Sequence, residues 1–336
     1  MANLPVNQVT LVGKVIRMDK RIGLTRDNRE FISMQFTLNI NDDQIKVESF
    51  AMKLKSDGSE TSAYKGLETL FEESVALHKT IKMPNEDKAT EVEDETIAQD
   101  IEDCTVLKFS NWNGFKYCRM EENTYAKDGQ LVKNIRLTSA YPNHVDLSKV
   151  EYKPQKDFEI CGLVKNEAIL MEKDDVEYLQ LLVVVPIYQE AWGDRSATVT
   201  LNDVTVTCHD ESVFDYIQDN FEKGTVVYLN GEIIRRVQRI ENEVEVDENR
   251  GFGRVMARQK TYTTNIEEYM EIMGGYPLES DEIEEMREFN QELWQVAKEL
   301  KETKEQEMLN GGERPKAKVG FGKEEKPKTK TNRLPF

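Results

Sequence analysis

Short stretches in which apolar and polar residues alternate, separated by polar connections, make up most of the first 240 residues. The first of these stretches are 8–16, 31–40 and 44–52, and they are rich in β-branched and aromatic residues. Alternation with a period of two is typical of strands that have one buried face. The pattern therefore predicts three consecutive strands near the start of the chain.

A helix and further strands complete this first round of elements. Residues 64–79 place their apolar side chains near helical spacing. After an acidic stretch, residues 104–111, 115–121 and 131–139 again have the composition of strands. The dipeptide Asn113–Gly114 lies between the first two of these strands and is a strong signal for a hairpin turn.

The same order of elements then occurs a second time, after Lys153 and Pro154. Several strands come first, a short helix follows, and further strands come last. Gly224, shortly after the helix, is the residue type that usually terminates one. Short strands with one helix per round favour small closed barrels, since a parallel α/β sheet would need a helix after every strand. In this second round, the predicted strands are 158–164, 178–188, 197–201, 204–208, 225–231 and 233–239, and the predicted helix is 212–221.

The C-terminal part of the chain changes character from Asn265, where the pattern turns helical. Apolar residues recur at intervals of three and four, with acidic residues between them, which predicts an amphipathic helix. The helix either packs on its own domain or mediates self-association into a homo-oligomer. The apolar positions are Met286, Phe289, Leu293, Val296 and Leu300.

The chain thus divides into four predicted segments. Residues 1–150 form a first barrel domain with an acidic insertion near 84–103, and residues 151–262 form a second. Residues 263–310 form a helical segment, and residues 311–336 form a disordered basic tail that ends in Leu-Pro-Phe. The predicted fold class is mainly β, with two barrels in tandem.

Charge is unevenly distributed along the 336 residues, which carry a formal net charge of −18. Nine acidic residues and one lysine lie between Pro84 and Asp103, and eleven acidic and four basic residues lie between Glu279 and Leu309. Without these two segments the body is nearly neutral and has local basic clusters, so an anionic partner is compatible with the total charge.

Several functional classes are disfavoured by the sequence. No apolar run has the length of a membrane span, and the N-terminus lacks the pattern of a signal peptide. The four cysteines have neither a disulfide framework nor zinc-ligand spacing. Cys208 and His209 are adjacent on a predicted strand and point to opposite faces, so they make a poor catalytic pair. We therefore expect a cytoplasmic protein without a metal or cofactor.

Five stretches resemble the bacterial and bacteriophage single-stranded-DNA-binding proteins. Residues 7–15 are similar to that family's first strand (N-x-V-x-L-V-G-x-L), and 31–40 and 45–53 to its second and third. Residues 223–233 resemble the strand after its barrel helix, and Leu334, Pro335 and Phe336 resemble its terminal tip. The resemblance implies OB-fold barrels of five strands that cover single strands, and a tip that recruits replication or repair proteins. Here the tip follows lysines, whereas the family has acidic residues before it.

Binding to a single strand requires basic side chains for the phosphates and aromatic rings for the bases. Three places combine both kinds of residue. For the first, the alternative is a solvated charged loop over buried phenylalanines, and in the third the alternative for Tyr188 is ordinary packing. The first comprises Arg17, Lys20, Arg21, Arg26, Arg29 and Phe31; the second Lys108, Trp112, Phe115, Lys116, Tyr117 and Arg119; and the third Tyr188, Trp192, Arg195, Arg235, Arg236 and Arg254.

The sequence therefore predicts a non-catalytic protein that binds single-stranded DNA without sequence preference, in bacteriophage replication or recombination. The tip or the acidic helix would contact partner proteins. Two alternatives remain open at this point. One is an acidic adaptor or DNA mimic that binds proteins, which the net charge favours, and the other is a nuclease on an OB scaffold.

Overall fold

The first barrel occupies the N-terminal part of the computed structural model, which describes residues 6–55, 57–84, 86–110, 118–140, 142–191, 196–243 and 260–310. The helix and six of the nine strands in this part correspond to predicted elements, whereas β4, β5 and β9 were not predicted. Its elements are β1 (Asn7–Leu24), β2 (Glu30–Ile40), β3 (Asp43–Met52), α1 (Ser62–Glu73), β4 (His78–Lys82), β5 (Thr90–Glu91), the 3₁₀ helix η1 (Ile101–Asp103), β6 (Val106–Phe109), β7 (Arg119–Lys127), β8 (Gln130–Ser139) and β9 (Asn143–His144).

The second barrel and the C-terminal helices follow. The strands of this barrel are longer than the alternation alone predicts, because pairs of predicted strands merge into one. The elements are β10 (Gln155–Val164), β11 (Ile169–Lys173), β12 (Val176–Gln189), β13 (Thr198–Cys208), η2 (Glu211–Val213), α2 (Phe214–Asn220), β14 (Val226–Glu243), β15 (Lys260–Pro277), α3 (Ser280–Glu284), η3 (Arg287–Phe289) and α4 (Gln291–Leu309).

Both barrels have the strand order of an OB fold. In barrel 2, β10 pairs antiparallel with β12 and β12 with β13, β13 runs parallel to β15, and β15 pairs with β14, which returns to β10. In barrel 1, β1, β2 and β3 pair in the same way, β3 runs parallel to β8, β8 pairs with β7, and β6 returns to β1. The predicted fold class, mainly β with two OB-like barrels in tandem, is confirmed.

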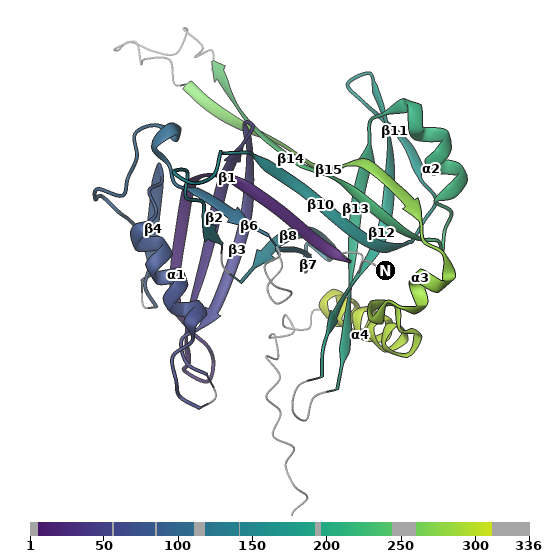
Figure 1. Ribbon diagram of the computed structural model, residues 1–336, viewed down its shortest axis with the longest axis horizontal. Helices are drawn as coiled ribbons and strands as arrows, with labels where there is room; N and C mark the ends of the chain where they lie inside the picture. The colour runs from purple at the N-terminus through teal and green to yellow at the C-terminus, as the bar shows by residue number, and fades with distance from the viewer. Residues whose placement is uncertain are drawn as a thin grey trace, which may run out of the picture.

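The two barrels meet edge to edge through their first strands. β1 pairs antiparallel with β10, from Asn7 opposite Ile160 to Val12 opposite Gln155. Figure 1 shows these two strands side by side at the centre of the molecule, with one barrel on each side. The described strands therefore belong to one continuous hydrogen-bonded sheet, which closes separately into each barrel.

Alternating side chains fill the interior of each barrel. On β2, Met34, Phe36 and Leu38 point inward and are fully buried, and on β12 Leu181, Val183 and Val185 do the same. The helix α1 covers one end of barrel 1. It begins after Thr61, whose hydroxyl accepts a hydrogen bond from the backbone N–H of Tyr64 at 3.2 Å. No helix in the described residues is long and apolar enough to cross a membrane.

Two predicted boundaries are wrong. Residues 263–277 are not helical, because they belong to β15, which pairs along its whole length with β14. β-branched and aromatic residues such as Thr264 and Tyr269 favour this extended conformation. The helix predicted over 64–79 ends at Glu73, and residues 78–82 form β4, which runs parallel to β1.

Asp43 links the two barrels and gives a stability prediction. Its carboxylate is buried, accepts a hydrogen bond from the backbone N–H of Arg235 at 2.9 Å, and lies 2.7 Å from Lys156 Nζ. Replacing Asp43 with alanine leaves this N–H without an acceptor and removes one of two carboxylates from Lys156. We expect a loss of about 3 kcal/mol in the free energy of unfolding, measured by urea denaturation. Asp219→Ala, at an exposed position on α2, should change it little, and equal effects would contradict the prediction.

Candidate nucleic-acid interface

The outer face of β2 and β3 carries an exposed pair of aromatic rings. In OB folds, oligonucleotides bind on the face of the second and third strands and on the adjoining loops. On β3, Ser49 and Ala51 are buried, whereas Phe50 between them points outward and is 54% exposed. Its ring centroid lies 5.1 Å from that of Phe31 on β2, with an angle of 34° between the rings. The pair offers aromatic surface where an OB fold binds bases.

A glycine on β1 allows Phe31 to lie close to the sheet. Gly23 pairs with Phe31 across the first hairpin. A Cβ atom at Gly23 would lie 2.3 Å from an atom of the Phe31 ring, which is closer than any real contact. Glycine is therefore required at this position for the ring to pack against β1, and this packing holds the ring in place beside Phe50.

Barrel 2 carries three rings in the equivalent position. Tyr178 on β12 stacks on His209, which directly follows β13, with centroids 5.1 Å apart and an angle of 27°. Tyr269 on β15 lies on the other side of His209, also at 5.1 Å. Glu271 fixes the imidazole, because its carboxylate accepts the backbone N–H of His209 at 2.8 Å and lies 2.6 Å from Nδ1. The three rings form a row across the outer face of the sheet.

The aromatic sets of the two barrels correspond in position. Phe31 and Tyr178 lie near the start of the second strand of their barrels, and Phe50 and His209 lie at the end of the third strand or directly after it. Of these residues only Phe31 is among the predicted site residues. The missed ones have a signal in the sequence, since Phe50 and Tyr178 occupy the outward positions of alternating strands.

Four arginines lie along the first hairpin, which also carries Phe31. The outward positions of β1 hold Arg17, which is hydrogen-bonded to Asp19 at 2.8 Å, and Arg21, which is exposed. Arg26 lies exposed in the turn, and Arg29 donates a hydrogen bond to the carbonyl oxygen of Leu54. Arg17 pairs with Thr37, six positions along β2 from Phe31, and the binding role of these arginines stays a prediction.

Further charged residues lie on the other side of the same face. Arg119 on β7 contacts Glu121 at 2.7 Å, and Arg136 on β8, which was not predicted, lies 3.2 Å from the same carboxylate group. Glu48 on β3 lies 3.6 Å from Arg136. The charges on this face are therefore mixed, and a phosphate would have to displace carboxylates from part of the arginine surface.

Three predicted binding residues lie elsewhere. Lys20 points into the barrel and is only 8% exposed. Arg235 is buried between the barrels and donates hydrogen bonds to the carbonyl oxygen of Gln44 at 2.7 Å and to Glu268 at 3.2 Å. Tyr188 packs in the apolar cluster under α4. Arg235 and Tyr188 therefore make structural contacts, and Lys20 lies off the outer face on which binding was predicted.

The remaining predicted residues divide into two groups. Lys108 on β6 and Arg236 on β14 are exposed, and Arg236 lies 3.8 Å from Glu267. The others lie outside the described residues, so their roles stay predictions: Trp112, Phe115, Lys116, Tyr117, Trp192, Arg195, Arg254, Leu334, Pro335 and Phe336.

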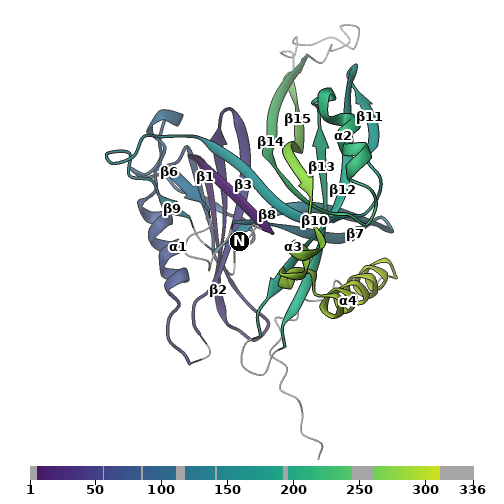
Figure 2. The same cartoon turned by 45° about the vertical axis from the view of Figure 1, so that its right-hand side comes forward.

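The helix α4 packs against β13 and covers part of the β12–β13 face. Figure 2 shows α4 close to β7. Trp294 and Ala297 of α4 pack against Val199 and Leu201 of β13. Val296 belongs to the predicted apolar stripe but is 55% exposed. The packed side of the helix is thus rotated from the predicted one. Among the described residues of barrel 2, the three rings lie outside the apolar cluster that α4 covers.

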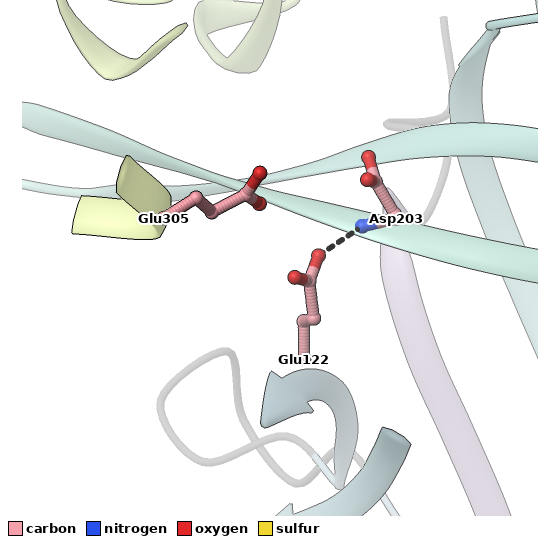
Figure 3. Close-up of side chains that lie close together, drawn as sticks. All are labelled: Glu122, Asp203 and Glu305. Carbon is pink, nitrogen blue, oxygen red and sulfur yellow. Dashed lines mark hydrogen bonds between the residues drawn. The ribbon is translucent and has the colours of Figure 1, made fainter. Parts of the chain in front are cut away.

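Three carboxylates meet where barrel 1, barrel 2 and α4 join. Figure 3 shows Glu122 from β7, Asp203 from β13 and Glu305 from α4, and the oxygen atoms of the three groups lie within 4.8 Å of one another. The carboxylate of Glu122 also accepts the backbone N–H of Asp203 at 2.7 Å. Such a cluster of oxygen ligands raises the question of a bound cation.

Three lysines already neutralise this cluster. Lys301 lies 2.6 Å from Glu122, Lys133 lies 2.9 Å from Asp203, and Lys165 lies 2.8 Å from Asp203. Burial alone would raise the pKa of Asp203, but hydrogen bonds from Lys165 and Lys133 and the charge of Lys301 hold it well below its usual value. We call these six side chains, including Glu305, the lysine–carboxylate network. The ion pairs of this network connect α4 to both barrels.

Comparison with known proteins places the chain in a family. The family model named YorF matches residues 118–311, which is more than half of the chain. The chain belongs to the YorF family. No curated protein matches the sequence.

Solved structures give matches with low similarity. The chain is similar to the wild-type single-stranded DNA binding protein from Thermus aquaticus, with a TM-score of 0.44 and 10% identity, over 82% of this chain and 93% of that one. A deletion mutant of the same protein matches with a TM-score of 0.43 and 11% identity, over 83% of this chain and 98% of that one. A Plasmodium falciparum SSB complex with ssDNA matches with a TM-score of 0.26 and 12% identity, over 39% of this chain and 100% of that one.

The YorF match includes only part of the interface. Tyr178, His209 and Tyr269 lie within it, as does the lysine–carboxylate network. The first hairpin and β3 precede it, so Phe31 and Phe50 fall outside the matched residues. The matched residues therefore comprise the β7–β8 hairpin, barrel 2 and the C-terminal helices.

Proposed function

We propose that this chain binds single-stranded DNA without sequence preference and performs no catalysis. The observation that carries the proposal is the pair of outward aromatic sets, Phe31 with Phe50 and Tyr178 with His209 and Tyr269, at corresponding positions of two OB folds. Stacking on aromatic rings contributes about 1–3 kcal/mol per base and tolerates every base. The arginines of the first hairpin would contact the phosphates.

The proposed setting is DNA replication or recombination in the cytoplasm, in a bacteriophage-infected cell. The four buried free thiols support a reducing compartment. Partner proteins would contact the tip Leu334, Pro335 and Phe336 or the outer side of α4, where Val296 and Leu300 are exposed among acidic residues. A second copy of the chain is a further proposed partner of that helix.

A titration of fluorescently labelled oligo-dT with the full chain at 50 and 200 mM NaCl tests the proposal. With about four phosphate contacts, a fourfold increase in salt should weaken binding roughly 50-fold, because the slope is about −0.7 per contact on single strands. An adaptor or DNA mimic would bind at neither salt concentration. Incubation of labelled strands with Mg²⁺ or Mn²⁺ should leave them intact, and cleavage would support the nuclease alternative.

A further inference from the structure

Two buried lysines converge on one phenylalanine at the α1 end of barrel 1. Lys20 on β1 and Lys79 on β4 are 8% and 2% exposed. Their Nζ atoms lie 5.2 Å and 4.6 Å from the centroid of the Phe71 ring, which belongs to α1. The two ammonium groups therefore lie close together, and their like charges repel each other.

The two lysines differ in their partners. Lys79 Nζ donates hydrogen bonds to the carbonyl oxygen of Ser74 at 3.1 Å and to the hydroxyl of Thr96 at 2.6 Å. Burial nevertheless lowers the pKa of Lys79. Lys20 Nζ has neither a hydrogen bond nor an ion pair within the described part of the chain; it faces the Phe71 ring and lines the same cavity as the nearby carboxylates. An ammonium group that lines a cavity and has no direct partner among the described residues can donate hydrogen bonds to an anion in that cavity.

Lys20 and Lys79 line a cavity of about 490 Å³. This volume falls in the usual range of small-molecule sites. Ile81 and Val92 supply apolar wall, whereas Asp94 and Glu95 of the acidic insertion also line the cavity, as does a glutamate of α1. A bound molecule would thus meet cationic donors, an apolar wall and carboxylate acceptors together.

This combination selects the ligand. A simple anion can bind the lysines but is repelled by the carboxylates. A nucleotide has a phosphate group for the lysines and hydroxyl or amino donors for the carboxylates. We propose that the cavity binds a nucleoside monophosphate, with its phosphate between Lys20 and Lys79 and its sugar or base donating to Asp94 or Glu95. The same chemistry is present in a free nucleotide and in the 5′-phosphorylated end of a strand.

The cavity is separate from the aromatic face. Successive residues of a strand point to opposite sides, so Lys20 faces the cavity while Arg21 faces outward with Phe31 and Phe50. The inference goes beyond the proposed function and does not depend on it, since a free nucleotide could occupy the cavity whether or not the outer face binds a strand.

Calorimetric titration of the full chain with dTMP tests the proposal, with Lys20→Met and the control Lys65→Met, an exposed lysine of α1 outside the cavity. We expect dTMP to bind the unaltered chain at least tenfold more tightly than inorganic phosphate does. Lys20→Met should weaken the binding of dTMP at least tenfold, and Lys65→Met should leave the affinity for dTMP unchanged. The melting temperature of Lys20→Met without ligand should be unchanged or higher, since methionine keeps the buried stem.

Oligo-dT with and without a 5′-phosphate separates the two sources of the ligand. Tighter binding of the phosphorylated strand, lost in Lys20→Met, assigns the cavity to strand ends, and equal binding of both strands with retained dTMP binding assigns it to free nucleotides. Equal affinity for dTMP and phosphate, no dTMP binding, or full dTMP binding by Lys20→Met would each overturn the proposal. Failure of the proposed DNA binding would appear separately, as loss of binding to both strands with dTMP binding intact.

Discussion

Replacing Phe50 and Tyr178 together with alanine should weaken oligo-dT binding by roughly 30-fold or more. Each ring is expected to stack on one base, and two lost stacking contacts correspond to about 2 kcal/mol at the low end of the range. Both side chains point outward, so the free energy of unfolding should change little. Fluorescence anisotropy at constant salt measures the affinity, and a thermal melt checks the fold.

Tyr216→Ala provides a matched control, because this tyrosine is exposed on α2 and belongs to neither aromatic set. The single variants show how much each barrel contributes to binding of the oligonucleotide. A loss of affinity in Phe50→Ala but not in Tyr178→Ala would assign binding to barrel 1. Unchanged affinity in the double variant would remove stacking on these faces from the mechanism. Stacking on Trp112 and Trp192, which the sequence predicts, would then be tested by the corresponding alanine variants.

Replacing Asp203 with asparagine should destabilise the protein by about 3 kcal/mol. The buried carboxylate compensates Lys133, Lys165 and Lys301, and its loss leaves these ammonium groups with too few anions in a region of low dielectric. Urea denaturation measures the loss, and α4 should detach at lower urea concentrations than the barrels unfold. Asp219→Asn serves as the control at an exposed position, and equal midpoints for the two variants would contradict the prediction.

The same network predicts how stability depends on pH. Burial opposes ionisation of Asp203 and Glu122, but their lysine partners lower the pKa of both below the usual values. At a pH just below 5 the unfolded chain therefore binds more protons than the folded one, and the stabilisation is lost progressively as the pH falls further. Denaturation midpoints at pH 7, 5 and 3.5 should decrease in that order, with a smaller decrease in Asp203→Asn. An identical decrease in both proteins would show that other carboxylates control acid unfolding.

The order of the elements was predictable because strand and helix periodicity are local properties. The strand around Phe36 alternates, the strand around Val183 is a continuous apolar run, and both barrels follow the expected order. The orientation of the first basic cluster was not predictable, because β1 contains a bulge between Val15 and Arg17. The extra residue shifts the alternation, so that Lys20 points inward and Arg17 and Arg21 point outward.

The aromatic face was missed for a different physical reason. Tyr178, His209 and Tyr269 come from three strands that are distant in sequence, and only long-range pairing brings them together. The sequence instead favoured turns in which aromatic and basic residues are close along the chain. Arg235 shows the limit of this approach, since its charge suggested exposure while the contact between the barrels buries it.

The edge contact between β1 and β10 has a consequence for how the protein behaves at low abundance. Two independent chains joined through such an edge would separate on dilution, because their association depends on concentration. Here both barrels belong to one polypeptide, and the linkage keeps each at a local concentration on the order of millimolar for the other. The two halves are also free to diverge in evolution: a substitution in one half has no identical copy in the other, which a symmetric pair of identical subunits would not allow.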